Sequence, residues 1–145
     1  MKKIVVFILP FFIIVMLTGC NSSKTIYQPE GTIIKDSHDY VMLPGDYSWK
    51  EDNVEMTTLS AYDIGELADQ FETLEVEKND ILTFHITKSP SSIIVTKYNE
   101  DGTSEVIETT NHQLTMPNNS GTYIYEMKAR WPQGKINFVF DVHVK

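Results

Sequence analysis

Two long stretches near the C-terminus alternate between apolar and polar side chains, and this alternation most limits what the chain can fold into. Residues 121–131 carry an aromatic or apolar side chain at every second position, and so do residues 135–145. Because successive side chains of a strand point to opposite faces, both stretches are predicted to be β-strands. Between them, Pro132-Gln133-Gly134 is typical of a turn, because proline presets φ and glycine accepts positive φ. The pair therefore predicts a long β-hairpin.

The chain from Gly31 onward repeats this pattern in shorter pieces. Turn-forming residues separate the pieces, and Asp101-Gly102 is the strongest hairpin signal among them. About 115 residues with seven to nine strands predict an all-β fold, an antiparallel two-sheet sandwich. Besides the C-terminal pair, residues 80–87, 92–98 and 104–109 are predicted strands, and the shorter candidates are residues 32–35, 40–43, 47–50, 54–58 and 74–77.

Residues 61–71 break the alternation. Their apolar positions recur at the i, i+3, i+4 and i+7 spacing of a helix, at Ile64, Leu67, Ala68 and Phe71. Asp63 and Glu66 have the spacing of a capping box. We expect a short helix that bridges the two sheets at one end and packs Leu67 and Phe71 into the edge of the core.

The N-terminus has the features of an export signal. Lys2 and Lys3 precede 14 uncharged, mostly large apolar residues, 4–17. A membrane-spanning helix needs roughly 20 apolar residues, so this stretch is too short to span. A basic start, a short apolar segment and small residues after it predict a signal peptide.

The apolar segment ends in Leu17-Thr18-Gly19-Cys20, which resembles the lipobox of bacterial lipoproteins. The resemblance implies that a lipoprotein signal peptidase recognises Leu17, Thr18 and Gly19 and cuts before Cys20, whose thiol carries a diacylglyceryl group. Two acyl chains hold a protein stably on a membrane, whereas one is marginal. An ordinary secreted protein or an uncleaved anchor helix is the alternative, and either keeps the domain outside the cytoplasm.

This interpretation divides the chain into three parts. Residues 1–19 are the predicted signal peptide, residues 20–30 a lipidated tether and residues 31–145 the sandwich domain. The predicted location is the extracytoplasmic face of the cell membrane, with attachment through Cys20. Because that cysteine is the only one, an internal disulfide and a Cys-rich zinc site are excluded.

The part of the chain that remains after the predicted cleavage is acidic. Residues 20–145 carry 10 basic and 20 acidic side chains, a formal charge of −10. Such a charge repels nucleic acid and anionic lipid headgroups, so we expect no nucleic-acid partner. An acidic surface instead attracts cations or a basic partner.

No arrangement of residues predicts catalysis or a cofactor. Ser-His-Asp sets are available only as Ser37-His38-Asp39 or as Ser60, His85 and Asp80, without a supporting motif. The four histidines are dispersed. The methionines that could join His38 in a copper site follow no ligand spacing; they are Met42, Met56, Met116 and Met127. Asp36, Asp39 and Asp46 lack the spacing of a calcium loop. The prediction is a non-enzymatic domain with no metal site and no cofactor.

Aromatic residues are the candidates for partner binding. Tyr47, Trp49 and Trp131 would form a binding face if they were exposed together. In the alternative arrangement, Trp49 and Trp131 cover the ends of the sandwich, and Tyr123 and Tyr125 line the core opposite phenylalanines of the last strand.

Three segments together resemble a known family. They are the run from Pro44 to Lys50, the 62–71 helix and the Gly-Thr-Tyr-Ile-Tyr-Glu to Trp-Pro-Gln-Gly segment of residues 121–134. They are similar to a small lipoprotein domain common in Bacillus and related Gram-positive bacteria, over most of residues 40–145. The resemblance implies an immunoglobulin-like sandwich on a lipid anchor and carries no known activity or catalytic positions.

The leading functional hypothesis is a lipid-anchored, non-enzymatic domain that binds a protein partner or supports an envelope assembly. A second hypothesis is a small-ligand or cation-binding accessory lipoprotein of a transporter or sensor. A third is an inhibitor of an envelope enzyme, acting through an exposed loop at residues 44–52 or 89–92. Fold alone does not decide among them.

Overall fold

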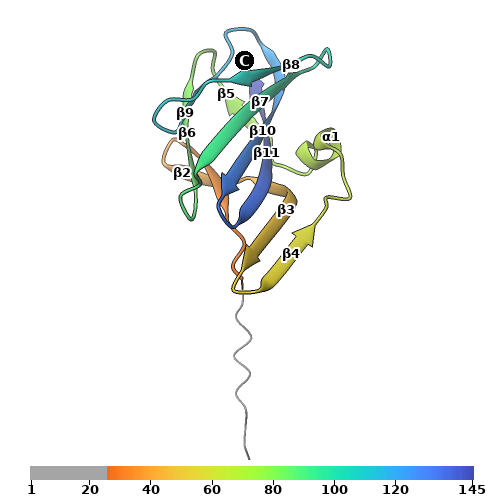
Figure 1. The fold of residues 1–145 in the computed structure, drawn as a ribbon. Helices are drawn as coiled ribbons and strands as arrows, with labels where there is room; N and C mark the ends of the chain where they lie inside the picture. Colours follow the sequence, from red (N-terminus) through yellow and green to blue (C-terminus); the bar gives the residue numbers. More distant parts are fainter. Residues whose placement is uncertain (1–25) are drawn as a thin grey trace, which may run out of the picture.

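Eleven strands and one short helix make up residues 26–145, the part of the chain that the computed structural model describes (Figure 1). The predicted signal peptide with Leu17, Thr18 and Gly19, the predicted lipidation site Cys20 and the first half of the tether lie outside the described residues. Within residues 26–145, no helix has the length and apolar character that a membrane span requires.

The strands form two sheets, which confirms the predicted two-sheet sandwich. The smaller sheet has the order β2-β1-β6-β9, and the larger has the order β4-β3-β11-β10-β7-β8 with β5 beside β11. The strands of the smaller sheet are β1 (Gly31–Lys35), β2 (His38–Val41), β6 (Ile81–Ile86) and β9 (Gln113–Thr115). Those of the larger sheet are β3 (Leu43–Glu51), β4 (Val54–Thr58), β5 (Leu74–Val76), β7 (Ser92–Asn99), β8 (Ser104–Ile107), β10 (Gly121–Trp131) and β11 (Gly134–Val144).

Two features of the sheets differ from the prediction. The count of seven to nine strands is wrong, because eleven form in residues 26–145, including the three-residue strand β9 that has no clear alternation. The pairing is also not antiparallel throughout, because β5 runs parallel to the end of β11. The strand β3 occupies the same edge of β11 only as far as Val139, which leaves the last residues of β11 free to pair with β5.

The predicted C-terminal hairpin is confirmed. Strand β10 has the expected bounds, and it pairs with β11 in unbroken register from Gly121↔Val144 to Trp131↔Gly134. This hairpin lies in the middle of the larger sheet, between β3 and β7. It therefore supplies the wall against which the smaller sheet packs.

The core lies between the inner faces of the two sheets. Tyr125 and Phe140 are opposite each other in the hairpin register, and their rings stack with centroids 5.0 Å apart. Both side chains are fully buried, as is Phe84 of the smaller sheet. The predicted core position of Tyr125 opposite a phenylalanine is thus confirmed, whereas Tyr123 is only partly buried.

The helix α1 (Ile64–Ala68) is shorter than predicted but begins as predicted. Asp63 accepts a hydrogen bond from the Glu66 backbone N–H at 2.9 Å, and Glu66 accepts one from the Asp63 N–H at 3.1 Å. This reciprocal pair is the expected capping box. Because two backbone donors at the helix start have partners, even a one-turn helix begins at a defined residue.

The predicted position of the helix is wrong. Leu67 packs with Ala68 on Val139, which lies on the outer face of the larger sheet, so α1 does not bridge the sheets. Val139 points outward because Phe138 and Phe140 on either side of it point into the core. Phe71 follows the helix and does contact the core, with its ring centroid 6.2 Å from that of Phe140.

Candidate functional site

The three aromatic residues predicted as a partner-binding face are buried. Tyr47 is 3% exposed, Trp49 2% and Trp131 7%, so these residues do not form a surface for a partner. Trp49 meets Trp131 edge to face with ring centroids 5.4 Å apart, and Tyr47 stacks beside Trp49 at 6.3 Å. Lys88 Nζ lies 4.8 Å from the centroid of the Trp49 ring. These contacts correct the exposed-face prediction and agree with the alternative in that both tryptophans are buried and not on a binding face.

A different apolar surface is exposed next to these rings, on the edge strand β4. All five residues of β4 are exposed, including Val54 at 40% and Met56 at 42%. Met56 is opposite Trp49 in the register, so the two side chains point to the same face of the sheet. Trp49 is nevertheless buried and Met56 is not. The reason is that β4 projects beyond the smaller sheet, which leaves its inner face uncovered (Figure 1).

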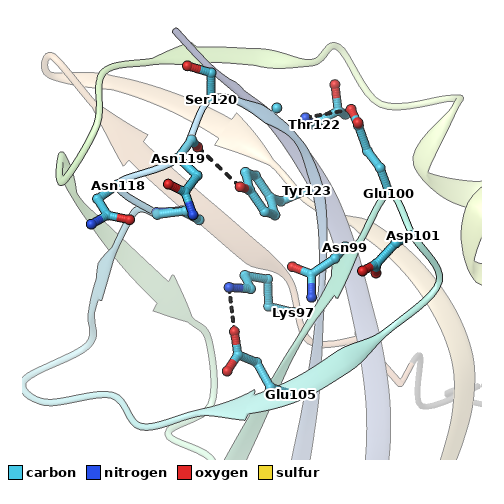
Figure 2. Close-up of a pocket in the computed structure, with 12 residues that line it drawn as sticks. Lys97, Asn99, Glu100, Asp101, Glu105, Asn118, Asn119, Ser120, Thr122 and Tyr123 are labelled. Carbon is cyan, nitrogen blue, oxygen red and sulfur yellow. Dashed lines mark hydrogen bonds and ion pairs between the residues drawn. The ribbon is translucent and has the colours of Figure 1, made fainter.

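A polar hollow of about 500 Å³ lies at the other end of the sandwich (Figure 2). The turn between β7 and β8 forms one side of it, and the segment that leads into β10 forms the other. The turn between β7 and β8 that borders it lies near the C-terminus, away from the end where the described chain begins (Figure 1). We call it the distal hollow, and its lining consists of Lys97, Asn99, Glu100, Asp101, Glu105 and residues 117–123.

Most charged groups of the distal hollow are already held by neighbours. Lys97 Nζ lies 2.5 Å from Glu105 Oε1 and 5.3 Å from the centroid of the Tyr123 ring. The Tyr123 hydroxyl donates to the Asn119 carbonyl at 3.1 Å, and Glu100 accepts a hydrogen bond from the Thr122 N–H at 2.8 Å. This side of the hollow is therefore ordered before any ligand arrives.

Other polar groups of the distal hollow are free. Among the hydrogen bonds of residues 26–145, none involves the side chains of Asn118, Asn119 or Ser120. Asp101 accepts hydrogen bonds from the Thr103 hydroxyl and N–H, which lower the pKa of its carboxyl group. The lining thus combines free amides, a hydroxyl and carboxylates, which suits a hydroxylated or cationic group. At its rim, the Thr122 hydroxyl lies 3.3 Å from His143 Nδ1.

The residues of the two hypothetical Ser-His-Asp sets are not hydrogen-bonded to one another. His38 Nδ1 contacts the Asp36 carbonyl at 2.9 Å, and Ser60 accepts from the Tyr62 N–H at 3.2 Å. Asp80 accepts from the Glu77 N–H at 2.8 Å, while His85 is exposed on β6. Within residues 26–145, no three His, Cys, Asp or Glu side chains lie close enough to hold a metal ion.

Two buried carboxyl groups on the outer face of the larger sheet were not predicted. Glu126 is 8% exposed and accepts hydrogen bonds from Tyr98 at 3.0 Å and Asn137 at 3.1 Å, with Lys128 Nζ at 3.3 Å. The alternation of apolar and polar residues places the two carboxyl side chains on the outer face of the sheet. It does not show that neighbouring side chains cover that face. The cross-strand register was the missing signal: Glu126 is opposite Val139, and Asn137, two residues away, is its diagonal neighbour on the same face.

The second of these groups, Asp141, is 7% exposed and only half satisfied. Its Oδ2 accepts from the Thr73 hydroxyl at 2.8 Å, whereas Oδ1 has no hydrogen-bond partner. Burial raises the pKa of this carboxyl group. A group whose pKa is higher in the folded state favours folding while it is protonated, and that contribution is lost as the pH rises through the folded pKa.

We therefore expect Asp141→Asn to stabilise the domain at neutral pH. The amide keeps an acceptor for Thr73 and removes a buried charge, so the gain should be on the order of 1 kcal/mol at pH 7. The gain should shrink toward pH 4, where the native carboxyl group is itself protonated to a growing extent. Urea unfolding of both proteins at the two pH values measures this difference, and an equal gain at both would contradict the assignment.

Comparisons with protein-family models, with curated proteins and with solved structures find no match for this chain.

Proposed function

We propose that this chain is a lipid-anchored, extracytoplasmic domain without enzymatic activity that binds a protein partner at the cell envelope. The lipobox-like Leu17-Thr18-Gly19-Cys20 supports the anchor, through a diacylglyceryl group on Cys20. The sandwich fold supports the resemblance to small immunoglobulin-like lipoproteins of Gram-positive bacteria, which is part of the proposal.

One observation carries the binding part of the proposal: the exposed strand β4. Val54 and Met56 place apolar side chains on the inner face of the strand, where no residue of the smaller sheet covers them. Exposed apolar surface that continues a buried core is typical of interaction sites, because covering it removes apolar area from water. The shape of the surface is an open strand and not an enclosed pocket, which favours a protein partner over a small ligand.

The test compares two matched substitutions in the anchored protein. Met56→Lys puts a charge into the proposed contact, and Ile94→Lys puts one at a similarly exposed position, 45% against 42%, on the opposite face of the same sheet. After crosslinking on intact membranes, we expect recovery of the partner to fall about tenfold or more with Met56→Lys. The Ile94→Lys protein should recover as much of the partner as the wild-type protein does.

Equal recovery with both substitutions would contradict binding at β4. Recovery of no partner from wild-type membranes, together with a rise in melting temperature on addition of calcium or another small ligand, would contradict the whole proposal. Both variants should unfold at wild-type temperatures, because each changed side chain is exposed.

The distal hollow supports a second candidate, the small-ligand-binding accessory lipoprotein. Its specific support is the set of free side chains, Asn118, Asn119 and Ser120, beside the partly buried Tyr123 ring. A neutral sugar that raises the melting temperature of the wild type, but not that of Asn118→Ala, would favour this candidate.

A further inference from the structure

We infer that β4 binds its partner by strand addition, and that the added segment alternates basic and apolar residues. This inference rests on the proposed function and names the mode of binding and the chemistry of the partner. In strand addition, an extended segment pairs with an exposed sheet edge through main-chain hydrogen bonds. Among residues 26–145, no strand pairs with the outer edge of β4.

The turn between β3 and β4 determines which backbone groups face that edge. Asp52 and Asn53 both have positive φ, 49° and 65°, as in a two-residue type I′ turn. The residues that flank such a turn, Glu51 and Val54, form a hydrogen-bonded pair, and such pairs alternate with non-hydrogen-bonded ones along the hairpin. The N–H and C=O groups of Glu55 and Thr57 consequently point away from β3, toward the free edge.

The side chains of β4 define the pattern of an added strand. Val54 and Met56 point to the inner face, beside Trp49, and Glu55 and Thr57 point to the outer face. A neighbouring strand in the same sheet places its own alternate side chains next to these two sets. Apolar residues therefore fit beside Met56, and basic residues fit beside Glu55.

Charge selects a basic partner over a second copy of this chain. The hairpin carries Glu51, Asp52 and Glu55 against Lys50, whose Nζ lies 4.0 Å from Glu55 Oε2. Residues 26–145 as a whole carry 9 basic and 20 acidic side chains, a formal charge of −11. Two copies of such a domain repel each other, whereas a basic segment is attracted.

The other sheet edges are less suited to strand addition. Edge strands are usually protected by shortness, proline or lysine. The edge strands β2 and β8 have four residues each, and β5 and β9 have three, whereas β4 has five. None of these strands contains proline or lysine, so length is what distinguishes β4. On β8, moreover, Glu105 is paired with Lys97 and Ile107 packs against the core.

The experiment measures binding of a synthetic peptide to the full-length lipidated chain in uncharged detergent micelles. The probe is a fluorescent, end-capped peptide of alternating Lys and Val, and its binding is followed by fluorescence anisotropy. One control peptide carries Glu in place of Lys. Another carries N-methyl groups on alternate residues, which keeps charge and apolar surface but removes the hydrogen-bonding donors of one edge.

On the protein, Thr57→Pro removes the outward N–H while the bonds between β3 and β4 remain, and proline is tolerated at that side of an edge strand. Thr57→Ala keeps the N–H and is the matched control. We expect Thr57→Pro and N-methylation of the peptide each to weaken binding about tenfold or more, and Thr57→Ala to bind like the wild type. The Glu peptide should not bind at detectable levels.

Unchanged binding with the N-methylated peptide would overturn strand addition, even if Thr57→Pro fails to fold. A wild-type dimer that Thr57→Pro abolishes in sedimentation would also overturn the inference, because a second copy would then occupy the edge. In the membrane crosslinking experiment, Met56→Lys could abolish capture of the partner while Thr57→Pro has no effect. That result would support the proposed function but overturn strand addition. Peptide binding that requires the Thr57 N–H, without any partner in the membranes, would support strand addition and contradict the proposed function.

Discussion

Replacing Gly134 with alanine is expected to lower the free energy of unfolding by about 3 kcal/mol or more. Gly134 begins β11 and is paired with Trp49 of β3. A Cβ atom at this position would lie 2.0 Å from the Ser48 carbonyl oxygen and 2.8 Å from Trp49 Cα. Because both of these are backbone atoms within a sheet, no change of side-chain rotamer relieves the overlap, and β3 must move away from β11.

The effect can be measured by urea unfolding, followed through the fluorescence of Trp49 and Trp131, which lie against each other beside Gly134. Gly65→Ala is the matched control. A Cβ there would meet only Asp63 Oδ1 at 3.4 Å, and alanine is a better helix former than glycine. That variant should therefore be as stable as the wild type or more stable, by up to about 1 kcal/mol. A loss below about 1 kcal/mol for Gly134→Ala would show that the contact between β3 and β11 is looser than described.

Replacing Cys20 with alanine is expected to abolish lipidation completely. Formation of the thioether requires a nucleophilic thiol, and alanine has no group that can take its place. Without the modification, the lipoprotein signal peptidase should leave the precursor uncut. Two acyl chains contribute about 0.8 kcal/mol per buried CH₂, and the uncut precursor would lack this lipid attachment.

Mass spectrometry of the protein from its own membranes measures both steps. The wild type should begin at Cys20 and carry the mass of a diacylglyceryl group, whereas Cys20→Ala should retain residues 1–19 and carry no lipid. Ser23→Ala, three positions beyond the cysteine, is the control and should be processed normally. Normal processing of the Cys20→Ala protein would refute the anchor and, with it, the proposed location.

Local features of this fold could be predicted because they depend on neighbours in the sequence. Alternation of apolar residues predicted the strands β10 and β11, and Pro132 predicted the turn between them. The turn role predicted for Gly134 is wrong, because this residue is part of β11 and does not have positive φ. The helix start followed from Asp63 and Glu66, three residues apart. Turns, caps and strand faces require no information about the rest of the chain, so the sequence determined them by itself.

What covers each face depends on the tertiary structure. Trp49 and Met56 share one face of the larger sheet, yet the first is buried and the second is exposed. Alternation assigns a side chain to a face, but the width and placement of the opposing sheet decide whether that face meets protein or water.

The same distinction explains the rest of the candidate site. The burial of Glu126 and Asp141, the parallel pairing of β5 and the distal hollow all arise between segments far apart in sequence. The sequence thus determined the long strands and the helix cap, because each is a local pattern, and it predicts the lipid anchor in the same way. Only the tertiary structure decided which surfaces are open to a partner, because exposure depends on how far one sheet extends beyond the other.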